Sequence, residues 1–277
     1  MSRDRYHLVL GFLRHPNLQF PQRLKIAPLN ADTTSHRYEN QRSQLPPIRA
    51  ITLDLDDTLW PSAPTITRAE QVAHAWLATH APAVAAMWSI EQLRELRMSI
   101  FNERPDLRHN FLRIRRMAML AAFERADLSG AAAHELIERA LDVFMTARNE
   151  VNLYPEVRDS LERLSRRFLL ASLTNGNADV ARIGIGHHFK AAISAHAHGT
   201  SKPDPALFHI ACRELACDPH EVVHVGDDME LDVRGARAAG LQVIWINRAN
   251  VVWAGDDAPF AVNDLLGLEQ WLEGRAV

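Results

Sequence analysis

The stretch Ile51-Thr52-Leu53-Asp54-Leu55-Asp56-Asp57-Thr58 decides the fold, because a short apolar run ends there in three acids. Such a run is typical of a buried strand whose carboxyl end meets a functional site. Three later motifs follow in order: Leu173-Thr174-Asn175-Gly176, Lys202-Pro203, and Gly226-Asp227-Asp228 with Asp232. An acid pair, a hydroxyl with adjacent amides, a lysine and further acids could together surround one phosphoryl group.

Strands and helices alternate along most of the chain. Apolar runs at 168–173, 192–195, 221–225 and 242–246 predict further strands, and helical periodicity predicts helices at 155–166, 205–215 and 230–239. This alternation favours an α/β fold with a Rossmann-like parallel sheet covered on both faces. Ligands of such sheets bind beyond the carboxyl ends of the strands, where all four motifs fall.

The alternation stops between residues 58 and 154. Apolar residues recur there at helical spacing, and the pattern indicates no strand. We therefore predict an all-helical cap domain at 64–151, inserted into a catalytic core of residues 48–63 and 152–277. Residues 1–47 are polar and aperiodic up to Pro46-Pro47, so we expect a poorly ordered extension with at most a short helix near 8–13.

Composition restricts the possible partners. The chain has 277 residues, 47% of them hydrophobic, and a net charge of -3, which argues against a broad nucleic-acid surface. No apolar stretch approaches the roughly 20 residues of a membrane helix. Cys212 and Cys217 are too few for a disulfide framework. We expect a cytoplasmic monomer or homodimer that binds neither nucleic acid nor a membrane.

The acids call for a cation. Asp54 and Asp56 are two residues apart at a strand end, so their side chains can point to the same side. Carboxylates that converge on one place repel each other unless a cation lies among them, and hard oxygen ligands of this kind suit Mg²⁺. The candidate metal residues are Asp54, Asp56, Asp227, Asp228 and Asp232.

A carboxylate can also attack phosphorus and form an aspartyl-phosphate. Lys202 is then the candidate cation that offsets the repulsion between the two anions, and Asp56 can act as the general acid and base. Hydroxyl and amide groups would hold the phosphate oxygens, and the candidates for this are Thr58, Thr174, Asn175, Gly176 and Lys202.

The four motifs resemble the signature motifs of the haloacid dehalogenase superfamily, in its helical-cap phosphatase branch. The resemblance covers roughly residues 50–250 and implies that Asp54 is the nucleophile, with Asp56 as the acid and base. It implies further that Thr174 and Lys202 bind the phosphoryl group. Mg²⁺ would be held by Asp54, the main-chain carbonyl of Asp56 and Asp227, with Asp228 or Asp232 acting through water.

The residues that flank the motifs point to one group of enzymes within this superfamily. The segments 174–178, 198–203 and 224–228 are similar to those of bacterial flavin mononucleotide phosphatases, which also dephosphorylate a ribitylamino-uracil phosphate in riboflavin synthesis. The resemblance therefore implies a small phosphorylated metabolite as substrate. Phosphoglycolate, a sugar phosphate or a nucleotide remain alternatives.

A few further residues are candidates for specificity. Trp60 follows the acidic loop and either packs under the cap or touches substrate, and Arg113 is the arginine that we expect to reach the substrate from the cap. His196 and His198 alternate as on one strand face, near His187-His188, but we do not expect a transition-metal site there.

Three other functions share parts of this pattern. A haloacid dehalogenase would use the same nucleophile on carbon, without needing Asp56 or Mg²⁺, and a phosphomutase would share the whole core. A signalling receiver module also combines acids, a threonine and a lysine, but it lacks a helical insertion of this size. Asp56 and the acids after Gly226 favour the phosphatase.

Overall fold

The computed structural model describes residues 47–253 and 256–273. Its centre is a sheet of parallel strands in the order β3-β2-β1-β4-β5-β6. The strands are β1 (Ala50–Leu53), β2 (Leu169–Thr174), β3 (Ala191–Ser194), β4 (Val222–Gly226), β5 (Gln242–Ile246) and β6 (Phe260–Val262). The expected α/β class with a parallel sheet is confirmed.

Strand β1 lies in the middle of the sheet, and all four of its residues are buried. Leu53 pairs with Ser172 of β2 on one side and with Val225 of β4 on the other. Parallel strands in this register end at the same edge, so the residues that follow Leu53, Leu173 and Val225 come together there. This edge carries the acidic loop, Thr174 and Gly226.

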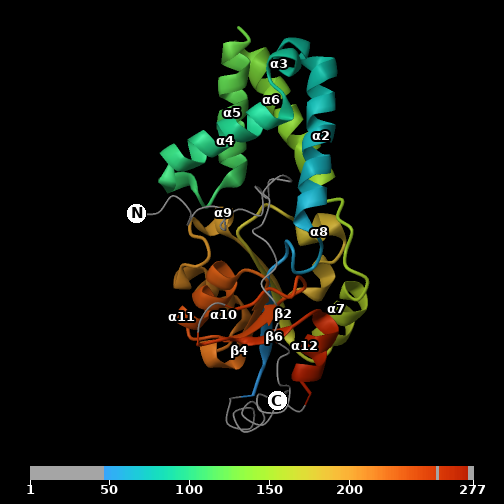
Figure 1. The fold of residues 1–277 in the computed structure, drawn as a ribbon, viewed down its shortest axis with the longest axis vertical. Coiled ribbons are helices and arrows are strands. Elements are labelled where there is room, and N and C mark those ends of the chain that lie inside the picture. The colour runs from blue at the N-terminus through green and yellow to red at the C-terminus, as the bar shows by residue number, and fades with distance from the viewer. Residues whose placement is uncertain (1–46, 254–255, 274–277) are drawn as a thin grey trace.

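Helices cover both faces of the sheet, as parallel strands require. Helices α7 (Val157–Ser165) and α12 (Leu265–Trp271) pack on one face, and α10 (Pro205–Leu215) and α11 (Gly235–Ala238) pack on the other (Figure 1). Shorter helical segments complete the core: α8 (Val180–Ile183), η3 (Gly186–His188), α9 (Ala195–His198), η4 (Pro219–Glu221) and the π-helix η5 (Met229–Arg234).

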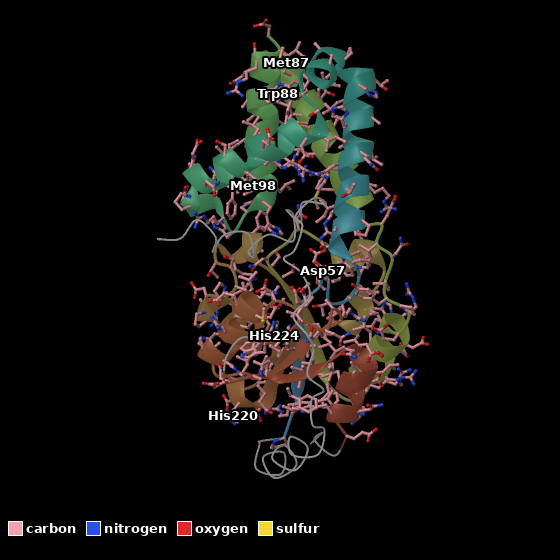
Figure 2. The ribbon with its side chains drawn as sticks, viewed as in Figure 1. Asp57, Met87, Trp88, Met98, His220 and His224 are labelled. Atoms are coloured by element: carbon pink, nitrogen blue, oxygen red, sulfur yellow. The ribbon has the colours of Figure 1, made fainter. Side chains whose placement is uncertain are left out.

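A second group of helices stands beyond the strand ends. It comprises α2 (Ser62–His80), α3 (Pro82–Met87), α4 (Ile90–Glu103), η2 (Pro105–Leu107), α5 (Phe111–Arg125) and α6 (Gly130–Arg148). These helices enclose an apolar core of their own, built around Leu77, Phe123, Ile137 and Leu141. Figure 2 shows Met87 and Trp88 at the far end of this helical part and Asp57 where it meets the sheet.

Residues 64–151 thus contain helices and no strand, as the periodicity predicts. The division of the chain into a core and a cap stays a prediction, and the short helix expected near 8–13 lies outside the described residues. Within the part of the chain that the structure describes, no helix is long and apolar enough to cross a bilayer.

Two local predictions need correction, and two elements were missed. His196 and His198 lie in the short helix α9, because β3 ends at Ser194. The helix expected at 230–239 is the π-helix η5 followed by α11. The sequence analysis predicts neither strand β6, whose three residues are too short a run to show a period, nor the seven-residue helix α12.

Candidate active site

Asp54 directly follows β1, and its main-chain amide donates to the carbonyl of Val225, 2.9 Å away. This bond extends the pairing with β4 by one residue and holds the Asp54 side chain at the sheet edge, where it is almost fully buried. The chain then turns sharply, and Asp57 adopts a positive φ of 59°. The Asp57 carboxylate accepts hydrogen bonds from the amide and hydroxyl of Ser62, at 3.0 and 2.6 Å, and so begins α2.

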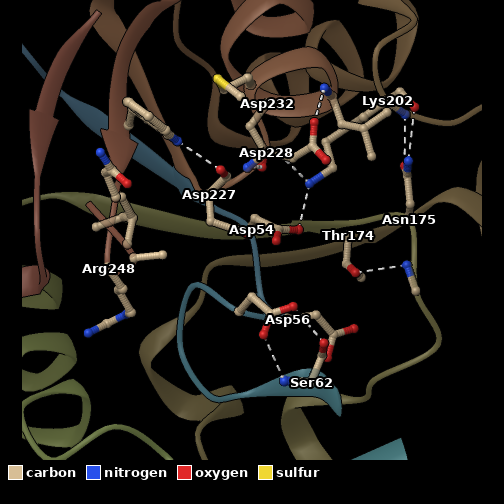
Figure 3. A pocket seen from close by; sticks show the side chains of 18 of the residues that line it. Asp54, Asp56, Ser62, Thr174, Asn175, Lys202, Asp227, Asp228, Asp232 and Arg248 are labelled. Atoms are coloured by element: carbon tan, nitrogen blue, oxygen red, sulfur yellow. Dashed lines mark hydrogen bonds and ion pairs between the residues drawn. The ribbon is translucent and has the colours of Figure 1, made fainter. Parts of the chain in front are cut away.

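Lys202 lies beside Asp54 in the close-up of the pocket (Figure 3). Its ammonium nitrogen is 2.5 Å from Asp54 Oδ1 and 2.6 Å from Asp232 Oδ1, and its side chain is 3% exposed. Asn175 fixes the main chain of Lys202 in both directions, because its Nδ2 donates to the Lys202 carbonyl and its Oδ1 accepts from the Lys202 amide. The second and third motifs are thereby joined.

Asp232 is anchored on its far side by a buried histidine that sequence reasoning missed. His224 Nε2 lies 3.0 Å from Asp232 Oδ1, and His224 Nδ1 lies 2.8 Å from the hydroxyl of Thr52. The other oxygen of Asp232 accepts from the amide of Asp228 at 2.9 Å. His224 directly precedes Val225 and Gly226 of the fourth motif. In the sequence it is only a polar residue within an apolar strand, and nothing there indicates its contact with Asp232.

Burial and charge shift the pKa values of these groups in opposite directions. Burial raises the pKa of Asp54 to about 8 against the opposing charge of Lys202, and the charge of Asp232 adds to the rise. Burial also raises the pKa of Asp227, assisted by the charge of Asp54. Burial alone would raise the pKa of Asp232, but the charge of Lys202 and the hydrogen bond from His224 hold it below its usual range.

Three of the five candidate metal residues come together. Carboxylate oxygens of Asp54, Asp227 and Asp232 lie within 4.8 Å of one another. Trp245 Nε1 donates to the Asp227 carbonyl at 2.8 Å and helps to fix that residue. Three oxygen donors around one point, two of them with raised pKa values, fit a hard divalent cation.

The other two acids are engaged elsewhere. One oxygen of Asp228 accepts from the amides of Glu230 and Leu231 at 2.8 Å and caps η5. The carboxylate of Asp56 faces away from the cluster: its Oδ1 accepts from Trp60 Nε1 at 2.9 Å, and both of its oxygens accept from Arg148.

The other phosphate-binding candidates are Thr174, Asn175 and Gly176 at the end of β2 and Thr58 in the acidic loop. The amide of Gly176 donates to Thr174 Oγ1 at 2.9 Å, and a Cβ at Gly176 would lie only 3.0 Å from Asp56 Oδ2. Glycine thus lets the loop approach the acid closely. Thr58 is fully buried, and its hydroxyl donates to Asp227 at 3.3 Å.

The two specificity candidates do not line the site. Trp60 is fully buried in the core, and it reaches the site through the bond from its indole to Asp56 and the bond from the Asp57 amide to its carbonyl. Arg113 is exposed on α5 and is not among the cavity-lining side chains. Arg248 instead reaches the rim, where it lies 3.7 Å over the Tyr154 ring and donates to Glu156 (Figure 3).

The motif residues open into a cavity of about 340 Å³. A second cavity of about 370 Å³ adjoins it and shares Phe111, Thr174, Asn175 and Gly176 with the first. Cap residues close one side of this second cavity, and α8, β3 and α9 close the other. Its further polar lining includes His109, Asn110, Arg116, Asn177, Arg182 and His196.

A buried carboxylate, a lysine that bridges two acids and a cluster of carboxylates meet at the end of the central parallel strand, an arrangement that fits a hydrolase. The sequence profile of the haloacid dehalogenase-like hydrolases matches residues 48–240, and the chain belongs to that family.

Its relatives include phosphatases and dehalogenases. The chain is 33% identical over 203 residues to the 5-amino-6-(5-phospho-D-ribitylamino)uracil phosphatase of Escherichia coli, covering 73% of this chain and 85% of that protein. It is 39% identical over 133 residues to a phosphoserine phosphatase of Thermus thermophilus, covering 46% of this chain and 52% of that protein.

Among solved structures, it is similar to a 2-haloacid dehalogenase from Pseudomonas syringae, with a TM-score of 0.77 and 38% identity. That match covers 82% of this chain and 98% of the other.

Proposed function

We propose that this chain is a Mg²⁺-dependent phosphomonoesterase that works through an aspartyl-phosphate on Asp54. The observation that carries the proposal is the meeting of the Asp54, Asp227 and Asp232 carboxylates beside the ammonium group of Lys202. As a member of its family, the protein is a phosphoric monoester hydrolase that acts on a small phosphorylated metabolite, and we place it in the cytoplasm.

The reaction has two displacements. A carboxylate oxygen of Asp54 attacks phosphorus, the bond from phosphorus to the leaving oxygen breaks, and Asp56 gives a proton to that oxygen. Water then attacks phosphorus, Asp56 accepts the proton of this water, and the bond from Asp54 to phosphorus breaks, which restores the carboxylate. Lys202, Thr174 and the amides near Gly176 hold the phosphate oxygens in both steps.

Asp54, Asp227 and the main-chain carbonyl of Asp56 would hold Mg²⁺, which supplies positive charge against a phosphate dianion. Asp232 would act through water, because its own oxygens already accept from Lys202, His224 and the Asp228 amide. Chelation is therefore expected to abolish phosphate release, and added Mg²⁺ should restore it. Full activity in metal-free buffer would contradict the role of the cation.

The substrate is a phosphate ester with a long polar leaving group, and flavin mononucleotide or a ribitylamino-uracil phosphate is our first choice. The second cavity supports this choice, since it continues from the phosphate-binding loop and carries hydrogen-bonding groups from His109, Asn110 and Asn177. Phe111 lines both cavities and offers an aromatic face at the junction between them. The Escherichia coli relative supports the same class of substrate.

The test is kcat/KM for flavin mononucleotide and the ribitylamino-uracil phosphate, beside phosphoserine, phosphoglycolate, ribose 5-phosphate and a pyrimidine nucleotide. We expect one of the ribityl phosphates to rank first. If both rank more than about tenfold below any other ester, about 1.4 kcal/mol in transition-state binding, the substrate choice is wrong and only the general phosphatase survives.

A haloacid dehalogenase is the second candidate, and the similarity to the Pseudomonas syringae structure favours it. It would use Asp54 to displace halide from carbon, and neither Asp56 nor the acids at 227 and 232 would be needed. Release of halide from 2-chloropropionate without any phosphate release would reverse the order of the two proposals.

A further inference from the structure

Arg148, the last residue of α6, reaches from the helical part into the site and contacts Asp56. Its side chain is fully buried, and its Nη2 lies 2.6 Å from Asp56 Oδ1 and 2.5 Å from Asp56 Oδ2. Sequence reasoning did not single it out, because nothing in the 64–151 insertion resembles a catalytic motif. It is nonetheless the cation that touches the candidate acid and base.

Contacts made by the residues on either side of Arg148 fix the main chain at this position. Arg68 of α2 donates to the carbonyl of Ala147 at 3.0 Å. The neighbouring Asn149 accepts from the amide of Asp179 through its Oδ1, at 2.8 Å, and so fastens the end of α6 to the loop that follows β2. Arg148 is therefore held at the junction of the helical part and the sheet with little freedom to move.

Stability does not explain its presence. Arg148 Nε and Nη1 are buried and have no protein acceptor among the described residues. Buried donors without partners cost free energy, and replacing a buried ion pair by apolar groups is often neutral or stabilising. The buried guanidinium of Arg148 therefore needs an explanation other than stability, and its contact with Asp56 supplies one.

Hydrogen bonds from Trp60 and Arg148 fix the orientation of the Asp56 carboxylate. Trp60 Nε1 holds Oδ1 from one direction, and Arg148 holds both oxygens from another. The ideal Cβ position at Gly176 lies 3.0 Å from Asp56 Oδ2 and 3.9 Å from Arg148 Nη2, so the held carboxylate faces the loop that we assign to phosphate binding.

We propose that Arg148 is a positioning residue that orients the Asp56 carboxylate towards the leaving oxygen, supplied by the cap helix rather than by any of the four motifs. The proposal rests on the phosphatase function above. Arg148 acts through Asp56, so its effect is confined to the two steps in which Asp56 moves a proton.

The experiment compares two kinds of ester. An alkyl phosphate needs a proton on its leaving oxygen, whereas the phenolate of p-nitrophenyl phosphate leaves without one. The value of kcat/KM covers the steps up to the aspartyl-phosphate, so the later activation of water does not enter. Arg148→Met is expected to lower kcat/KM at least about tenfold for the alkyl ester and less than about threefold for the aryl ester.

Three further variants complete the test. Asp56→Asn should show the same selective loss, and the double variant should lose little more than Asp56→Asn alone, because both changes remove one function. Arg139→Met is the matched control: Arg139 lies on the same helix, is exposed and, among the residues that the structure describes, forms an ion pair with Glu135 alone at 3.7 Å, so its kcat/KM should not change. Arg148→Lys keeps a cationic donor group and should recover part of the loss, and it serves as the test variant if Arg148→Met does not fold.

Equal losses on the two esters, or additive losses in the double variant, would overturn the positioning role. A marked fall in Tm with unchanged selectivity between esters would assign Arg148 to the fold instead. If Asp56→Asn itself shows no preference for the aryl ester, the assignment of Asp56 as the acid fails, and this result is separate from any property of Arg148.

Discussion

The ammonium nitrogen of Lys202 lies 2.6 Å from a carboxylate oxygen of Asp232, and both side chains are almost wholly buried. The same nitrogen also touches Asp54, so one cation serves two acids at the end of the central strand. His224 Nε2 lies 3.0 Å from the same oxygen of Asp232. The site is thus built on a buried polar chain from Thr52 to Asp54, within an otherwise apolar sheet.

Removing the shared cation should destabilise the fold. Lys202→Met leaves the ionised carboxylate of Asp232 buried without its cation, which typically costs about 3–5 kcal/mol. The free energy of unfolding in urea measures the loss. Lys190→Met is the control, since Lys190 is exposed. A change below about 1 kcal/mol for Lys202→Met would mean that the buried charge of Asp232 does not depend on Lys202 in the folded protein.

Asp54 should make stability depend on pH in the metal-free protein. Its pKa is 3.8 in an ordinary setting and about 8 in the fold, so between these values the folded state binds a proton that the unfolded state has released. The free energy of unfolding therefore falls as pH rises through this window. The raised pKa of Asp227 acts in the same direction.

The measurement is thermal or urea unfolding of the wild type and Asp54→Asn across that window. The wild type should lose stability relative to the variant as pH rises, and Mg²⁺ should remove most of the difference because it favours the carboxylate. Parallel curves for the two proteins without metal would contradict the raised pKa.

Gly226 shows how little space separates β4 from the site. A Cβ at this position would lie 2.3 Å from Cγ of Asp232, an overlap that requires the Asp232 side chain to move. We expect Gly226→Ala to displace Asp232 from Lys202 and to lower both stability and activity. Gly184→Ala is the control, because Gly184 has a positive φ of 84° but open space around it, so only backbone strain of roughly 1–2 kcal/mol is expected. If Gly226→Ala is no more harmful than this control, the loop is looser than the structure indicates.

Much of this arrangement could be predicted from the sequence. The acids, Thr174 and Lys202 follow apolar runs, and parallel strands bring their carboxyl ends to one edge. The apolar run at 242–246 matches β5 residue for residue. The fold and the core of the site were therefore predicted from regular apolar patterns and from motifs that follow strand ends.

The remainder depends on tertiary contacts. Arg148 and Arg248 lie far from the motifs in sequence, and only packing brings them to Asp56 and Tyr154. From sequence alone Trp60 could be placed either under the cap or against substrate, whereas the structure buries it fully among the core residues of the sheet. His224 reads as a polar exception within β4 until its contact with Asp232 gives it a partner.

The most direct test of the aspartyl-phosphate on Asp54 is to trap it. Borohydride added during turnover of the preferred phosphate ester reduces an acyl phosphate and converts the modified aspartate to homoserine, which peptide mass spectrometry can locate. We predict homoserine at position 54 alone, none in Asp54→Asn, and none when substrate is omitted. Conversion of another acid, such as Asp227, or active turnover with no conversion at position 54, would contradict the account.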